Sequence, residues 1–302
     1  MSHLSRLVLF ISLGCGCGTS SNAADPPDAA PAGTPDAPAS SSGLRTLDSC
    51  TTSIAADAPA FYKRYFRCVT ITSSASGVTI ATDDLPPHKS AYYPKTDPNY
   101  VAWDSSRGSQ YHQNPNSIAK QAIAVKVPAS PAAGGGAVLD AEVDGQAHTS
   151  GREYNLGPAG VALDGTAIYA GFAAPGDDLA AEAYTFDDYG AHPDPGGSYH
   201  YHSPTPGPLE VLQAIGAVTK TTPGTAEVEL YGVLCDGTVV LGCTELDGKA
   251  PAGSLDAQGG HVGDLAADGT TYFTGRYHVH VCADAKQGHA FTPEIHYYAA
   301  CN

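Results

Sequence analysis

Apolar and polar residues alternate in several short stretches of the chain, most clearly at 69–72, 78–82 and 122–127, which are rich in β-branched residues. A period of two is typical of β-strands, whose successive side chains point to opposite faces. One stretch, 208–215, favours a short helix with a proline near its start. The pattern predicts a mainly β fold, an antiparallel sandwich or barrel-like domain with long loops and little helix.

The strictest alternation is Tyr-His-Tyr-His at 199–202. On a strand, His200 and His202 share one face and the two tyrosines share the other. Two imidazoles on one strand face can bind a single Zn²⁺ or Cu²⁺ ion through nitrogen at about 2.0 Å. His192 follows a glycine-containing turn that can bring it over the same face. We therefore expect these three histidines to converge on one point.

Three blocks of sequence occur twice, in the same order. The first copy contains 160–169, 186–192 and 199–202, and the second contains 232–241, 255–261 and 277–280. Ordered recurrence of this kind indicates an internal, pseudo-twofold duplication of 160–202 and 232–280. We expect His261, His278 and His280 to form either a second equivalent cluster or the other half of the first. Val279 replaces a tyrosine in the second tetrad, on the face away from the histidines.

Four aspartates accompany the repeated blocks. Asp164 and Asp236 each precede a glycine between apolar segments, a pair that favours a tight hairpin turn, so both are turn residues or additional site residues. Asp187 and Asp256 stand five residues before the single histidine of their copy. They could orient an imidazole through its second nitrogen, or cap a turn. Both interpretations stay open.

The start of the chain has the layout of a bacterial lipoprotein signal peptide. Residues 1–14 hold one arginine and the apolar run 7–13, which is too short to span a bilayer, and Cys15 follows Gly14. Cys15 is the expected lipidation site, and an ordinary cleaved secretory signal is the alternative. Both interpretations predict an extracytoplasmic protein. The lipid would anchor it to the outer or cytoplasmic membrane of the cell envelope, in the periplasm or on the cell surface.

A flexible linker is expected at 15–43, because Ala, Pro, Asp and Ser dominate there and cannot form a core. One β domain is then expected at 44–302. The chain of 302 residues carries 31 acidic and 15 basic residues, a net charge of −16. This charge and the lack of a basic patch argue against a nucleic-acid partner. Protein partners are not indicated.

Six cysteines remain beyond the signal region, and an even number in an exported chain indicates three disulfides. We expect the pairs closest in sequence, Cys50–Cys68, Cys235–Cys243 and Cys282–Cys301. No C-x-x-C spacing occurs, which argues against a thiolate metal site.

Several of these motifs also carry a resemblance to a known family. LPPH at 85–88, LGPAGVALDGTAIY at 156–169 and the block 186–202 stand in the order found in YHYH-domain proteins, a group of mostly bacterial, exported proteins. The resemblance extends from residue 80 to residue 300. It makes His88, in the LPPH block, a further candidate site residue.

Three classes of function fit the sequence. The first is an extracytoplasmic protein that binds a Cu or Zn ion through its histidines. The second is a metal-dependent hydrolase or oxidase that uses the same cluster with an open coordination position. Its acids and bases would come from Asp187, Asp256, His88 and the tyrosines. The third is a structural or adhesive surface module. No sequence feature names a substrate, so metal binding is the first interpretation.

Overall fold

The computed structural model describes residues 43–129, 157–169, 179–256 and 259–282. The expected signal peptide, Cys15 and nearly all of the linker fall outside the described residues. Among the helices of the described part, none is long and apolar enough to cross a membrane.

Four strands form the first sheet, in the order β1-β2-β3-β4. They are β1 (Ser53–Ile54), β2 (Thr70–Ser74), β3 (Gly77–Thr82) and β4 (Ile123–Pro128). β2 and β3 pair as an antiparallel hairpin with Ile71 opposite Ile80. In β3, buried and partly buried residues alternate, which is the period-two pattern that predicted this strand.

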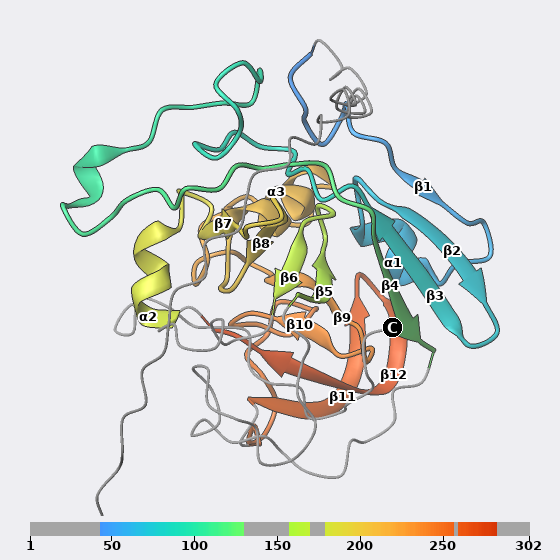
Figure 1. Ribbon diagram of the computed structural model, residues 1–302. Coiled ribbons are helices and arrows are strands. Elements are labelled where there is room, and N and C mark those ends of the chain that lie inside the picture. Colours follow the sequence, from blue (N-terminus) through green and yellow to red (C-terminus); the bar gives the residue numbers. More distant parts are fainter. Residues whose placement is uncertain (1–42, 130–156, 170–178, 257–258, 283–302) are drawn as a thin grey trace, which may run out of the picture. The chain divides into compact units, whose positions relative to one another are not determined.

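Eight strands form the second sheet, in the order β11-β12-β10-β9-β5-β6-β8-β7. They are β5 (Pro158–Ala162), β6 (Ala167–Tyr169), β7 (Ala191–Pro193), β8 (Tyr199–Tyr201), β9 (Leu230–Leu234), β10 (Val239–Leu241), β11 (Gly260–Ala267) and β12 (Thr270–His280). The two Asp-Gly hairpins, β5–β6 and β9–β10, occupy the middle of this sheet (Figure 1).

Helices are short in the described part of the chain. They are α1 (Ala60–Tyr65), α2 (Leu179–Glu182), α3 (Pro206–Ala214) and the 3₁₀ turns η1 (Ser105–Arg107) and η3 (Ala183–Thr185). The helix expected at 208–215 is therefore present as α3, which has proline in its first turn. The mainly β fold class is confirmed.

The sequence predicts antiparallel strands, but some strand pairs of the described residues are parallel. β1–β2, β6–β8 and β10–β12 are parallel. β6 and β8 are neighbours because β7, which lies between them in sequence, pairs with the outer side of β8. In the same way, β11 lies between β10 and β12 in sequence but pairs with the outer side of β12. Neither described sheet closes into a barrel.

The second sheet has the same order of strand types whether it is followed from one edge or from the other. Each edge begins with the strand of the single histidine (β7 or β11), followed by the tetrad strand (β8 or β12) and an Asp-Gly hairpin. At the centre, β5 and β9 pair antiparallel with Val161 opposite Val233, flanked by Gly160 opposite Leu234 and Ala162 opposite Gly232. A twofold axis through the Val161–Val233 pair would produce this register.

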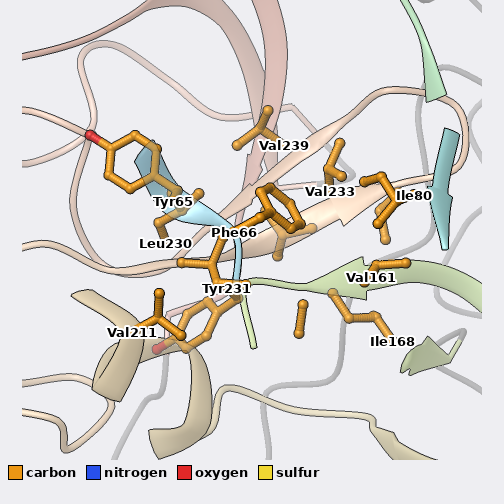
Figure 2. Close-up of a cluster of buried hydrophobic side chains, with 14 of the residues drawn as sticks. Tyr65, Phe66, Ile80, Val161, Ile168, Val211, Leu230, Tyr231, Val233 and Val239 are labelled. Atoms are coloured by element: carbon orange, nitrogen blue, oxygen red, sulfur yellow. The ribbon is translucent and has the colours of Figure 1, made fainter. Parts of the chain in front are cut away.

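One hydrophobic core joins both sheets and two helices. Figure 2 shows Phe66, which follows α1, among Ile80 of β3, Val161 of β5 and Val233 of β9, with Val211 of α3 nearby. All five side chains are fully buried, and burying one such side chain contributes about 1.5–3 kcal/mol to stability. The same core extends to the histidine strands, through Tyr199 and Tyr201 of β8 and Tyr277 and Val279 of β12.

The disulfides agree with the sequence in one pair only. Cys50 and Cys68 are bonded as expected. Cys243 is bonded to Cys282, with the Cα atoms 4.4 Å apart, so the expected pairs Cys235–Cys243 and Cys282–Cys301 are wrong. The reason is the parallel pairing of β10 and β12, which places Leu241 opposite His280 and brings the next two residues of each strand together. Cys235 is also disulfide-bonded, and Cys301 lies outside the described residues.

Candidate metal centres

Cluster 1 consists of His192, His200 and His202. β7 and β8 pair with His192 directly opposite His200, so the two imidazoles lie on one face of the sheet. His202 follows two residues after His200 and returns to that face. The three side chains are buried, and one nitrogen from each lies within 4.8 Å of the others. The structure therefore brings the three predicted histidines together.

Cluster 2 consists of His261, His278, His280 and Glu245. His261 stands opposite His278 in the β11–β12 pair, which repeats the arrangement of cluster 1. Glu245 reaches the histidines from the loop after β10, and its oxygens lie 2.9 Å, 3.2 Å and 3.7 Å from the Nε2 atoms of His261, His278 and His280. The described residues thus contain two separate clusters, not two halves of one site.

Hydrogen bonds fix the position of the imidazole proton in cluster 1. The Nδ1 atom of His200 lies 3.0 Å from the carbonyl oxygen of Ser198, which can only accept. The hydroxyl of Thr185 donates to the carbonyl of Glu182 and therefore accepts from Nδ1 of His192, at 2.6 Å. In the neutral form, both rings carry the proton on Nδ1 and present an unprotonated Nε2.

Backbone carbonyls have the same role in cluster 2. Nδ1 of His278 donates to the carbonyl of Arg276 at 3.0 Å, and Nδ1 of His280 donates to the carbonyl of Gly242 at 2.9 Å. Ligand histidines in metal sites are usually oriented in this way, by an acceptor on the second nitrogen.

Burial keeps these imidazoles neutral. It lowers the pKa of His192 to about 3 and holds the pKa of His200 well below its usual value, with repulsion between the neighbouring imidazoles as a further cause. Burial also lowers the pKa of His278 and His280, against the opposing effects of their backbone acceptors and of Glu245. Neutral imidazole is the form that binds metal ions.

Aromatic rings hold the histidines of cluster 1 in place. The ring of Tyr169 stacks on that of His200 with centroids 3.7 Å apart, and Phe186 lies parallel to His202 at 5.5 Å. The hydroxyl of Tyr169 donates to Asp194 at 2.8 Å. These contacts restrict the imidazole rotamers, which favours a preformed site.

His88 does not join either cluster. Its ring stacks on Tyr189 with centroids 3.5 Å apart, and its Nε2 lies 3.1 Å from the hydroxyl of Tyr201. Tyr201 in turn donates to Asp164 at 2.8 Å. Because the tyrosines of the tetrad face away from its histidines, His88 and Asp164 belong to a polar network on the opposite face of β8.

Asp187 and Asp256 bind the tetrad tyrosines. The hydroxyl of Tyr199 donates to Asp187 at 2.8 Å, and that of Tyr277 donates to Asp256 at 3.0 Å. Each aspartate also closes the turn before the single-histidine strand, because its backbone N–H and C=O both take part in hydrogen bonds there. The turn-capping interpretation is the one that the structure supports, and Thr185 and backbone carbonyls orient the imidazoles instead.

Asp164 and Asp236 are turn residues in their hairpins. Their Oδ1 atoms accept from the backbone N–H of Thr166 at 3.1 Å and Thr238 at 2.8 Å. Burial raises the pKa of Asp236 to about 7. These carboxylates hold the hairpins that position the tetrad strands.

The sequence did not reveal the glutamates near the clusters. Glu245 contacts all three histidines of cluster 2, and Glu182 lies 4.0 Å from Nε2 of His202 in cluster 1. In both copies, a glutamate occurs between the Asp-Gly hairpin and the single-histidine strand, but at different distances along the chain. An alignment of the copies therefore does not pair them.

Residues 142–257 match the family described as YHYH protein. The match contains all of cluster 1, and it ends before the three histidines of cluster 2. No curated protein and no solved structure matches the chain. Residues 142–257 are therefore similar to the YHYH protein family, and cluster 1 contains the two histidines of the Tyr-His-Tyr-His tetrad at 199–202.

Proposed function

We propose that the protein is an extracytoplasmic metal-binding protein that holds a Cu or Zn ion in each of its two clusters. The proposal depends above all on the position of the protons in cluster 2. His278 carries its proton on Nδ1, so its Nε2 presents a lone pair to a carboxylate oxygen of Glu245 only 3.2 Å away. Two acceptors at that distance repel each other unless a cation lies between them.

A proton or a metal ion could supply that positive charge. A proton on Nε2 is disfavoured because burial lowers the pKa of His278 and of His280. In cluster 1, the same burial acts on His192 and His200, whose Nδ1 protons are directed to outer acceptors. A metal ion bound by the converging nitrogens satisfies both clusters.

The donor atoms favour a transition metal. Among the residues that the structure describes, cluster 1 offers imidazole nitrogens, and cluster 2 adds one carboxylate oxygen. Imidazole suits Zn and Cu, whereas Mg and Ca prefer oxygen ligands. A tetrahedral ion with bonds of about 2.0–2.1 Å needs ligand atoms about 3.4 Å apart, so nitrogens within 4.8 Å require only small side-chain movements.

Export is the second part of the proposal. Disulfides persist in oxidising compartments, and the described residues contain Cys50–Cys68 and Cys243–Cys282. The lipoprotein-like segment before Cys15 supports a lipid anchor in the cell envelope. Fractionation of cells and mass analysis of the mature N-terminus test this part, and an unmodified protein in the cytoplasm would contradict it.

We also propose that the two clusters arose by internal duplication. Equivalent residues have equivalent partners in both halves: Ala167 pairs with His200 as Val239 pairs with His278. The central register of β5 and β9 relates the two copies by a local twofold axis.

Metal analysis of protein purified without a histidine tag tests the metal-binding proposal. We expect one ion per cluster in the wild type, and the loss of one ion in His200→Ala and of the other in His278→Ala. The matched control is His112→Ala, because His112 is exposed and lies outside both clusters. Metal content that stays the same in both cluster variants would refute the proposal.

A further inference from the structure

Tyr169 of β6 lies on the histidine face of the second sheet. The parallel pair β6–β8 sets Ala167 opposite His200, and Tyr169, two residues after Ala167, returns to the same face. Its ring stacks on that of His200, with the centroids 3.7 Å apart and the planes at 10°, and it meets the ring of His202 edge-on at 6.2 Å. Tyr169 therefore packs against two members of cluster 1.

The hydroxyl of Tyr169 binds to the turn between β7 and β8. Burial raises the pKa of Tyr169, so the hydroxyl keeps its proton and donates a hydrogen bond to Oδ2 of Asp194 at 2.8 Å. The other carboxylate oxygen, Oδ1, accepts from the backbone N–H groups of Gly196 at 2.8 Å and Ser198 at 3.0 Å. Asp194 thus joins Tyr169 to the turn 194–198.

Ser198 completes a closed circuit of contacts. Its carbonyl oxygen accepts from the backbone N–H of Asp194 at 2.9 Å and from Nδ1 of His200 at 3.0 Å. Its hydroxyl donates to the buried carboxylate of Asp84 at 2.6 Å, which holds Ser198 in place. The turn that binds the hydroxyl of Tyr169 thus sets the direction of the His200 Nδ1–H, while the ring of Tyr169 sets the plane of the imidazole.

An imidazole binds an ion well when its plane and its lone pair are both directed at the ion. We propose that Tyr169 is a positioning residue, which acts with the turn 194–198 to hold His200 in its metal-binding orientation before an ion arrives. This inference rests on the proposed function and assigns a role to a residue that acts through its contacts with a ligand. An imidazole that is already oriented loses less rotational freedom on binding, so Tyr169 increases the affinity of cluster 1.

The second copy of the repeat suggests the variant to make. Leu241 stands at the position of Tyr169 when 232–241 is aligned with 160–169. The β10–β12 pair places Leu241 opposite His280. Tyr169→Leu therefore gives cluster 1 the residue that the second copy has beside its own tetrad strand, and Tyr169→Phe removes the hydroxyl alone.

The zinc affinity of cluster 1 tests the proposal, measured by competition with a chromophoric chelator in the His278→Ala background. Tyr169→Leu should weaken zinc binding by about 10–100-fold, the usual effect of losing a group that orients a ligand. Tyr169→Phe keeps the stacked ring and loses one hydrogen bond, so its effect should be smaller, about three- to tenfold. The matched control is Tyr272→Leu, because Tyr272 is also partly buried and packs on another ring, that of Tyr65. It should leave the zinc affinity unchanged.

A measurement on the metal-free protein reports the orientation of His200 directly. Its Nδ1 proton is bonded to the carbonyl of Ser198, and NMR follows the exchange of this proton with solvent. Tyr169→Leu should accelerate the exchange by at least about tenfold. The Nδ1 proton of His278, bonded to the carbonyl of Arg276, should exchange at the wild-type rate.

Three results would overturn the proposal. They are an unchanged zinc affinity of cluster 1 in Tyr169→Leu, an equal loss at cluster 2 when the same substitution is made in the His200→Ala background, and equal effects on the two Nδ1 protons. Should Tyr169→Leu fail to fold, a zinc affinity of Tyr169→Phe equal to that of its parent would overturn it as well. A wild-type protein that binds no zinc or copper would instead refute the proposed function itself, so the two failures are distinguishable.

Discussion

Asp187 is a buried carboxylate that accepts hydrogen bonds from the hydroxyl groups of Tyr199 and Ser90. Burial raises the pKa of Asp187 to about 6, although these hydrogen bonds oppose the shift. Its counterpart Asp256 accepts from Tyr277. At the scale of single residues, the tyrosine face of each tetrad is thus fixed to the turn that leads into the neighbouring histidine strand.

This raised pKa predicts a dependence of stability on pH. In the unfolded chain Asp187 titrates near 3.9, so the folded protein holds the proton more tightly. Its contribution to the unfolding free energy is complete below about pH 4 and is lost as pH rises through about 6. Asp187→Asn imitates the protonated form. Its stability relative to the wild type should therefore improve by up to about 3 kcal/mol between pH 4 and pH 8.

Urea unfolding of both proteins at the two pH values measures this difference. Comparing the variant with the wild type cancels the titration of the histidines, which both contain. The control is Asp188→Asn, because the Asp188 side chain is 70% exposed. A stability difference for Asp187→Asn that does not vary with pH would contradict the assignment.

Single residues also show which parts of the candidate site could be predicted from the sequence. The six histidines were predictable because strand alternation and the repeat both marked them. Glu245 was not predictable, because it lies in a loop where no periodicity fixes the direction of a side chain. His88 was assigned from its motif alone, which says nothing about the face of β8 on which it lies.

At the scale of elements, local sequence predicts some of the strands and helices but not the order of the strands in the sheet. β2, β3 and α3 were predictable from local pattern, since the alternation and the proline determine them locally. The parallel neighbours of β8 and β12, and with them the Cys243–Cys282 bond, depend on the order of strands in the sheet. That order results from contacts between residues far apart in sequence.

The central strand pair gives a test at this scale. A Cβ atom on Gly232 would lie 2.3 Å from the carbonyl oxygen of Val161, and one on Gly160 would lie 2.5 Å from that of Val233. Either clash must push β5 and β9 apart. Gly232→Ala and Gly160→Ala should each lower the unfolding free energy by about 1–3 kcal/mol.

Chemical denaturation measures this loss, and Gly43→Ala is the control because no atom lies within 4 Å of a Cβ at that position. Similar losses in both variants are expected from the symmetric register. Wild-type stability in either variant would show that the strands do not approach each other as closely as described.

At the scale of the whole molecule, the core fixes the middle of the eight-stranded sheet, and the two clusters lie toward its opposite edges. An ion in cluster 1 would link β7 to the end of β8, and one in cluster 2 would link β11, β12 and the Glu245 loop. The net charge of −16 favours the approach of cations. Metal ions would therefore stabilise the edges of the sheet in addition to the apolar core, which also includes Tyr199 and Tyr201 of β8 and Tyr277 and Val279 of β12.

Zinc should accordingly raise the melting temperature. A ligand at a hundredfold excess over its dissociation constant contributes about 2.7 kcal/mol per site, and each kcal/mol corresponds to about 2–4 °C in a protein of this size. Differential scanning calorimetry with and without zinc measures the shift. His200→Ala combined with His278→Ala should abolish it, and an unchanged shift in this double variant would place the stabilising ion elsewhere.

The Cys243–Cys282 bond lies beside cluster 2. Cys243 stands two residues before Glu245, and Cys282 stands two residues after His280, so the bond joins the loop that supplies the carboxylate to the strand that supplies the imidazoles. In a reducing compartment the two segments are not covalently joined. If the protein is exported and binds metal as proposed, capture of the ion by cluster 2 would be a late step of maturation that follows oxidation of this cysteine pair.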